Sequence, residues 1–229
     1  MTKPEEPDFL TATRRTYQKV AQAYTRASSE GLQVRPYDRA MLPLFAELVR
    51  EAGGTRVADV GCGSGFVTQF LHELGLDVFG LDLSPAMLEQ ARRSYPHLEF
   101  REATILDLPV TDLSLHGITA LFSFNTVPIE HLSQAFQGFH RALQPGGVVL
   151  LAFSVREEPL ELRTWLDHDV TLPLQRLVPD EVSQALGEAG LPVQAQLLHQ
   201  PRPPHETRPY VHLLAQKATS AGPSQSFTP

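Results

Sequence analysis

Three alternating glycines and two acidic residues form the part of the sequence best suited to chemistry. Gly61, Gly63 and Gly65 follow a short apolar run, and an apolar-periodic segment begins directly after them. Glycine allows a tight turn and a close approach of the backbone to a ligand, because it has no Cβ. Asp59 stands two residues before the first glycine, and Asp82 ends the next apolar run. The pattern predicts a ligand crevice at the carboxyl ends of two strands.

The residue types around this loop decide which ligand it suits. A dinucleotide-binding fingerprint would need a third glycine where the chain has Phe66, and no Gly-Lys-Ser/Thr of a triphosphate-binding loop follows. A carboxylate at Asp59 suits a cationic group and repels a pyrophosphate. An acid at the position of Asp82 commonly binds both hydroxyls of a ribose. Together the two acids indicate a nucleoside without phosphates that carries an ammonium and a sulfonium group, which is S-adenosylmethionine.

The sequence resembles the class I S-adenosylmethionine-dependent methyltransferases from about Tyr17 to Ala215. Segments 59–65, 80–88 and 141–147 carry the resemblance, in the order and spacing of that family. It implies an α/β fold with a doubly wound, mostly parallel, Rossmann-like seven-stranded sheet and a final antiparallel strand. It also implies methyl transfer to a small-molecule acceptor by in-line displacement, with S-adenosylhomocysteine as the product.

The resemblance further implies roles for individual residues. Asp59 would meet the amino group of the cofactor, and Asp82 would accept the two ribose hydroxyls. Leu83 and Met87 would flank the adenine. Where relatives usually carry an acid that binds the adenine amino group, this chain has Thr104, a weaker acceptor than a carboxylate. The residues expected to contact the cofactor are Tyr17, Tyr24, Asp59, Gly61, Cys62, Gly63, Asp82, Leu83, Met87, Thr104, Ile105 and Ser123.

Two of these positions have more than one interpretation. The helical spacing of Tyr17, Val20 and Tyr24 predicts an amphipathic helix, which could bury an apolar stripe, cover the cofactor, or do both. Cys62 lies near a predicted helix start, where a thiol can become reactive. We interpret it instead as a small residue that fills space, since relatives commonly hold cysteine here without using its sulfur.

No catalytic base or metal site is required by the sequence. A single cysteine excludes a multi-cysteine zinc site, so no metal is expected. His131 and His168 are weak catalytic candidates, because a lone histidine in a loop is usually a surface group. His168 lies between Asp167 and Asp169, which could orient it. His116 has no functional interpretation.

The elements that would position these residues alternate between strands and helices. Strands are expected at Arg56–Val60, Leu76–Leu81, Leu98–Ala103, Ile118–Phe124, Val148–Phe153, Val193–Leu198 and Tyr210–Ala215. Helices are expected at Thr11–Tyr24, Asp38–Ala52 and Pro179–Ala189, after the glycine loop, after Ser84-Pro85, and around Leu132–Leu143. This order predicts a parallel sheet covered by helices on both sides. Residues 11–217 would form a single methyltransferase domain, in which helices within 11–52 cover the cofactor, and 1–10 and 218–229 would be flexible ends.

Composition limits the class of protein. The chain has 229 residues, 42% of them hydrophobic and 20% charged, which is enough for a packed core. A formal net charge of −7 offers no basic field to a nucleic acid. The longest apolar run is far shorter than the roughly 20 residues of a membrane helix, and the first residues lack the apolar core of a signal peptide. We therefore expect a cytoplasmic monomer or homodimer without nucleic-acid or membrane partners.

The motifs specify the methyl donor rather than the acceptor. Contacts to the acceptor are expected from the amino-terminal helices, the segment after the fourth strand, and the insertion 156–177. A catalytically silent S-adenosylmethionine-binding protein is an alternative that the weakened adenine motif leaves open. A nucleotide-dependent oxidoreductase is opposed by Phe66, and a nucleic-acid methyltransferase is opposed by the net charge.

Overall fold

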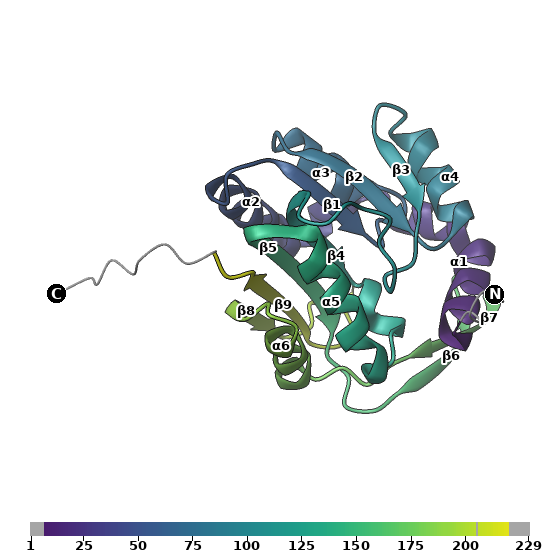
Figure 1. Ribbon diagram of the computed structural model, residues 1–229. Coiled ribbons are helices and arrows are strands. Elements are labelled where there is room, and N and C mark those ends of the chain that lie inside the picture. The colour runs from purple at the N-terminus through teal and green to yellow at the C-terminus, as the bar shows by residue number, and fades with distance from the viewer. Residues whose placement is uncertain (1–6, 205, 220–229) are drawn as a thin grey trace, which may run out of the picture.

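A single seven-stranded sheet organises the part of the chain that the computed structural model describes, residues 7–204 and 206–219 (Figure 1). Its strands are β1 (Arg56–Val60), β2 (Asp77–Asp82), β3 (Glu99–Glu102), β4 (Leu115–Leu121), β5 (Leu143–Ser154), β8 (Val193–His199) and β9 (Tyr210–Gln216). They follow the order β3-β2-β1-β4-β5-β9-β8. The first five are parallel, and β9 runs antiparallel to both of its neighbours. The expected mostly parallel sheet with a late antiparallel strand is confirmed.

Helices cover both faces of this sheet. They are α1 (Asp8–Ala27), α2 (Pro36–Glu51), α3 (Phe66–Glu73), α4 (Pro85–Ser94), α5 (Leu132–Ala142) and α6 (Pro179–Glu188), with short 3-10 turns η1 (Gly31–Val34), η2 (Ser123–Thr126) and η3 (Ile129–His131). Along β5, Val149 and Leu151 join a buried cluster with α5 and α6, while Val148 and Leu150 join one with α2 and α3. This alternation explains why β5 is apolar throughout. In the described ranges no helix is long and apolar enough to cross a membrane.

The amino-terminal helix begins earlier than the sequence pattern predicted. It starts at Asp8, and Phe9 and Leu10 are buried in the main core, so our assignment of these residues to a flexible end is wrong. Their side chains have a hydrophobic partner surface that local composition cannot reveal. Residues 1–6 and 220–229, the rest of the expected flexible ends, lie outside the described residues.

Strand β4 ends before Phe122, three residues earlier than expected. Phe122 adopts a left-handed conformation with φ 63°, and the chain then turns into η2. Asn125 anchors this turn, because its Oδ1 accepts hydrogen bonds from the backbone N–H and the hydroxyl of Ser154, both at 3.1 Å. The turn carries Ser123 to the carboxyl edge of the sheet instead of extending the strand.

A two-stranded sheet occupies the insertion, where no regular structure was expected. It consists of β6 (Leu160–Trp165) and β7 (His168–Leu174), paired antiparallel. Figure 1 shows this hairpin beside α1. The hydroxyl of Thr16 donates to the carbonyl of Thr171 at 3.3 Å, and the ammonium of Lys19 donates to the carbonyl of Asp169 at 3.0 Å. The hairpin therefore holds α1 in place.

A buried carboxylate connects three elements of the core. Asp59 in β1 is 2% exposed, and its two oxygens accept hydrogen bonds from Thr68 in α3 at 2.7 Å and from Thr119 in β4 at 2.9 Å. Burial raises the pKa of Asp59 from its ordinary value of 3.8 to about 6, against the opposing effect of the two hydroxyls. The folded protein therefore holds this proton to a higher pH than the unfolded chain does.

This pKa shift predicts a pH-dependent gain of stability for Asp59→Asn. Between about pH 4 and pH 6 the folded state binds the extra proton, so the wild-type free energy of unfolding falls as pH rises, by up to about 3 kcal/mol. Asparagine does not titrate, so the free energy of unfolding of the variant does not fall in this way. Urea unfolding should show that the free energy of unfolding of the variant, relative to that of the wild type, is higher at pH 7.5 than at pH 4. A difference that does not change with pH would contradict the prediction, and the exposed Asp77→Asn serves as control.

Candidate functional site

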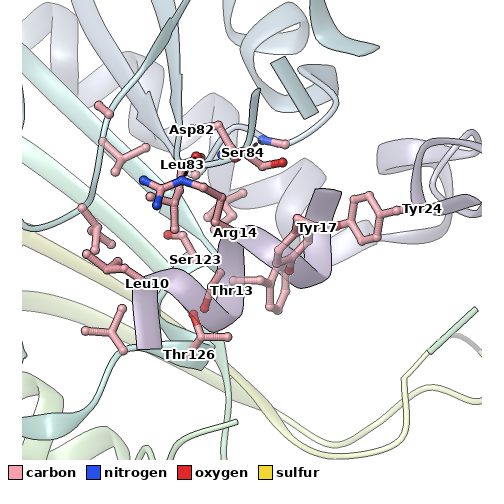
Figure 2. A pocket seen from close by; sticks show the side chains of 18 residues that line it. Leu10, Thr13, Arg14, Tyr17, Tyr24, Asp82, Leu83, Ser84, Ser123 and Thr126 are labelled. Atoms are coloured by element: carbon pink, nitrogen blue, oxygen red, sulfur yellow. Dashed lines mark hydrogen bonds between the residues drawn. The ribbon is translucent and has the colours of Figure 1, made fainter. Parts of the chain in front are cut away.

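A cavity lies between α1 and the carboxyl ends of β1, β2 and β4 (Figure 2). Figure 2 shows α1 running along it, with Leu10 and Thr13 toward one end and Arg14 beneath Leu83 and Asp82. Most residues expected to contact the cofactor line this cavity: Tyr17, Tyr24, Gly61, Gly63, Asp82, Leu83, Ile105 and Ser123. Segments far apart in the sequence thus meet where the motif pattern predicted.

Two glycines of the loop have different structural reasons to be glycine. Both adopt positive φ, 75° at Gly61 and 55° at Gly63. A Cβ on Gly61 would collide with the Cβ of Ser123, so this position is fixed by packing. A Cβ on Gly63 would meet only Met87 and Tyr24, at 3.5 and 3.9 Å, which are ordinary contact distances. Gly63 lines the cavity, so its backbone can contact a ligand there.

Asp82 joins the glycine loop to the start of α4. Its Oδ2 accepts a hydrogen bond from the backbone N–H of Gly63 and its Oδ1 accepts one from that of Ser84, each at 2.8 Å. The helix cap itself is Ser84, whose hydroxyl accepts from the N–H of Met87. Burial raises the pKa of Asp82, and the backbone hydrogen bonds oppose that rise. Each carboxylate oxygen keeps a second lone pair for a hydroxyl in the cavity.

Two tyrosine rings line one side of the cavity, and the indole of Trp165 packs against both. Tyr17 and Tyr24 of α1 contact Trp165 of the hairpin edge to face, with both ring centres 5.5 Å from the indole. Burial raises the pKa of both tyrosines, so their hydroxyls stay protonated. The sequence pattern singled out the helix but missed Trp165, because nothing local connects residue 165 to residue 17.

The histidines proposed as weak catalytic candidates do not line the cavity. His168 is exposed at the start of β7, and His131 in η3 packs its ring against Phe9 at 5.0 Å between centres. The flanking carboxylates that suggested a role for His168 sit on the solvent side of the hairpin. His116 packs over Gly54, where any Cβ would collide with the imidazole, so its role is in packing. The described residues contain no group of three potential ligands that could hold a metal ion.

Two further expected residues lie outside the cavity wall. Met87 is fully buried, with its Cε beside Gly63. The hydroxyl of Thr104 accepts a hydrogen bond from the N–H of Asp107 at 3.1 Å, within a local turn. The neighbouring Ala103 lines the cavity in its place. The hydroxyl of Thr104 thus takes part in a local turn, at the position where the sequence has threonine in place of the family's usual acid.

A second lobe continues past the glycine loop. It shares Gly61 and Gly63 with the main cavity, and Asp59 and Arg35 line it as well. Cys62 also reaches this lobe, but its side chain packs in a small apolar cluster of α4 and β3. Burial raises the pKa of the Cys62 thiol, which favours its protonated form.

Two hydroxyls in the cavity are unpaired; Ser123 was among the expected cofactor contacts, whereas Thr13 was not. The Oγ of Ser123 and the Oγ1 of Thr13 are buried without a hydrogen-bond partner, and both residues line the cavity. Buried polar atoms are normally paired, so these two have hydrogen-bonding capacity for a bound molecule. Arg14 lies on the same wall, and its Nε donates to the carbonyl of Leu83 at 3.3 Å.

Comparison with known proteins gives consistent matches. A methyltransferase-domain family model matches residues 57–147. A demethylmenaquinone methyltransferase of Chlorobaculum parvum is 39% identical over 93 residues, which is 40% of this chain and 38% of that protein. A malonyl-acyl-carrier-protein O-methyltransferase of Pectobacterium atrosepticum is 31% identical over 181 residues, 73% of this chain and 66% of that protein. The chain thus spans less than two thirds of the length of these relatives.

The fold recurs among solved structures. The magnesium protoporphyrin IX methyltransferase of Synechocystis PCC 6803, solved with bound S-adenosylmethionine, matches with a TM-score of 0.70 over 94% of this chain and all of its own. At 16% identity this likeness concerns the fold alone. The family model and the relatives agree with it, and the chain belongs to the class I S-adenosylmethionine-dependent methyltransferases.

Proposed function

We propose that this protein transfers the methyl group of S-adenosylmethionine to a small-molecule acceptor. The observation that carries the proposal is the meeting of Asp82 and the glycine loop in one cavity, with Asp59 directly behind them. A cavity with acids at the ends of two adjacent parallel strands suits a nucleoside that carries positive charge rather than phosphates.

The residues present fit this cofactor. The backbone of Gly63 can contact a ligand in the cavity, and Asp82 offers two carboxylate lone pairs to the ribose hydroxyls. Leu83, Ala103 and Ile105 give the cavity an apolar wall suited to adenine. Thr104 does not contribute to that wall, so the adenine would be held mainly by apolar contact.

The cofactor supplies a methyl group on a sulfonium, a strong electrophile, and the chain mainly has to position the nucleophile. Placing two reactants in line contributes about 7–11 kcal/mol to such a reaction. The aromatic rings of Tyr17, Tyr24 and Trp165 exclude water from one side. The free hydroxyls of Ser123 and Thr13 offer hydrogen bonds to a polar group of the acceptor.

The acceptor we propose has an apolar body and a nucleophile that does not need a strong base. Leu10 and Val127 line the cavity near the free hydroxyls, which gives an apolar surface with a polar centre. The tyrosines on the wall stay protonated, and neither candidate histidine lines the cavity. An oxygen that is already ionised, or a neutral amine, reacts without giving up a proton first. The net charge of −7 opposes a nucleic-acid substrate.

A silent cofactor-binding protein is the second candidate, and Thr104 is the observation that favours it. Thr104 has no carboxylate and does not line the cavity, and its hydroxyl accepts a hydrogen bond from the N–H of Asp107 in a local turn. Incubation with labelled S-adenosylmethionine and a panel of phenols, carboxylic acids, amines and quinols separates the candidates. Labelled product with any acceptor supports the enzyme, and cofactor binding without product over the panel supports the silent protein.

Calorimetric titration provides the first test of cofactor binding. We expect S-adenosylhomocysteine to bind and to raise the melting temperature progressively with concentration, because it prefers the folded state. NADH is the control, since a dinucleotide should not fit beside Asp59. No heat and no melting shift at millimolar S-adenosylhomocysteine would contradict the proposal, and binding of NADH instead would revive the oxidoreductase.

Gly63→Val should abolish binding while the protein stays folded. A Cβ at this position already contacts Met87 and Tyr24, so the valine methyl groups would take up space beside the loop that the ligand needs. The positive φ of 55° also disfavours a branched residue. Gly53→Val is the matched control, because Gly53 also has a positive φ, 93°, but has no atom within 4 Å of an added Cβ. Equal S-adenosylhomocysteine affinity in both variants would show that the loop is only a structural turn.

Asp82→Ala should weaken S-adenosylhomocysteine binding by about 30- to 150-fold, equivalent to about 2–3 kcal/mol, through loss of charge-assisted hydrogen bonds. It should also lower the melting temperature, because Gly63 and Ser84 lose a shared acceptor. Asp77→Ala, at the exposed start of the same strand, removes a carboxylate without touching the cavity and should leave affinity unchanged. An Asp82→Ala affinity within threefold of the wild type, with a lowered melting temperature, would leave only a structural role.

A further inference from the structure

Two arginines stand opposite each other just beyond the end of the pairing between β5 and β9. The regular pairing ends at Ser154. One residue later the backbone N–H of Val155 donates to the carbonyl of Pro209 at 2.8 Å, in the same antiparallel register. That register, continued by one step, sets Arg156 against Arg208. Side chains at directly opposite positions have Cβ atoms about 4.5–5.5 Å apart, so their charges act on each other.

Arg156 is buried without a partner for its charge. Among the residues that the structure describes it is the only buried lysine or arginine, with 8% of its surface exposed. Its backbone exchanges two hydrogen bonds with Leu177, but its guanidinium makes no hydrogen bond or ion pair with a described residue. The half-buried Arg141, in contrast, donates to two backbone carbonyls and pairs with Asp112. A buried charge is costly unless it is paired, so Arg156 lacks a negative partner.

The nearest charge makes this burial less favourable still. Burial lowers the pKa of Arg156, and the positive charge of Arg208 lowers it further. Arg208 is half-buried, and its guanidinium also makes no hydrogen bond or ion pair with any residue in the described ranges. A guanidinium keeps its charge at neutral pH, and like charges at opposite positions of paired strands are destabilising. The fold therefore brings two positive charges together with no negative charge to balance them.

The acidic side chains nearby in the sequence do not supply that negative charge. Glu206 is buried, and its Oε2 accepts a hydrogen bond from the backbone N–H of Arg202 at 3.0 Å. The same oxygen lies 3.6 Å from the Nδ1 of His199. The two glutamates at 157–158 directly follow Arg156 but are exposed, and they form no ion pair with it. The missing partner is therefore a group from outside the chain.

We propose that Arg156 and Arg208 bind an oxyanion, a carboxylate or phosphate group, of an acidic small molecule. An oxyanion between the two side chains would pair with both charges at once, and the planar fork of a guanidinium matches two oxygens of such a group. The pair lies at the carboxyl edge of the sheet, where ligands of wound α/β proteins collect. Neither arginine lines the cavity or the second lobe, so the inference does not depend on the proposed function.

The oxyanion can come from two sources, because the arginine pair lies close to the turn that lines the cavity. The Oδ1 of Asn125 in η2 accepts hydrogen bonds from Ser154, two residues before Arg156. Ser123 and Thr126 of the same turn line the cavity. The group bound by the arginines can thus be a free anion, or an acidic group on a larger molecule whose body occupies the cavity.

The test follows the melting temperature at pH 7.5 as inorganic phosphate is added, with sodium chloride of matched ionic strength in parallel. Chloride reports how far salt alone screens the repulsion. We expect phosphate to raise the melting temperature beyond chloride, because it binds the folded state. Arg156→Met and Arg208→Met should each raise the half-saturating phosphate concentration about tenfold or more. Without phosphate and at low salt, both variants should melt at or above the wild-type temperature, because each removes one of two repelling charges.

Arg15→Met is the matched control, because it removes the same charge from an exposed position on α1 and should leave the phosphate response unchanged. If Arg156→Met does not fold, Arg156→Lys replaces it, which keeps the charge without the planar fork and should bind phosphate several-fold more weakly. Equal stabilisation by phosphate and chloride overturns the inference, as does a phosphate response that both arginine variants retain. Lower melting temperatures of both variants without phosphate would show that the pair stabilises the fold unaided, which also overturns it.

Phenyl phosphate separates the two sources, because it carries the same oxyanion on an apolar body. Half-saturation at a several-fold lower concentration than for inorganic phosphate supports an acidic group on a larger molecule. Equal concentrations support a free anion. Either result supports the oxyanion site, provided that Arg156→Met weakens the response to both compounds.

Discussion

The burial of two carboxylates at the ends of adjacent parallel strands is the constraint on which this structure depends. Asp59 is buried and Asp82 is half-buried at the cavity, and each accepts two hydrogen bonds that compensate for lost contact with water. Thr68 and Thr119 serve the first, and backbone N–H groups of the glycine loop and of the α4 start serve the second. The loop geometry, the position of α3 and the pairing of β1 with β4 all contribute to meeting this requirement.

That arrangement opposes stability but suits binding. Burial raises the pKa of both acids, and repulsion from Asp82 raises the pKa of Asp59 further. A ligand with positive charge relieves the repulsion, so part of the free energy lost in folding is recovered on binding. An apolar or amide residue at position 59 would give a more stable protein with lower affinity for a positively charged ligand. The acids are therefore better explained by the ligand than by the fold.

The central half of the fold and the glycine loop were predictable because their signals are local. Continuous apolar strands, glycines at the turn, and Ser84-Pro85 at a helix start each act within a few residues. The hairpin was missed because β6 is largely exposed and has little apolar periodicity. The role of Trp165 and the burial of Phe9 depend on partners more than 100 residues away. The sequence shows that Thr104 replaces the acid usual in the family, but its hydrogen bond with Asp107 is seen only in the structure.

Helix α1 forms a wall of the cavity and is fastened to a hairpin about 150 residues away in the sequence. The start of the same helix is anchored separately, because Phe9 and Leu10 are buried in the main core. One wall of the cavity is therefore positioned by partners that lie far from the glycine loop in the sequence. A change in the hairpin, remote from any reacting atom, would shift that wall and with it the space left for a ligand.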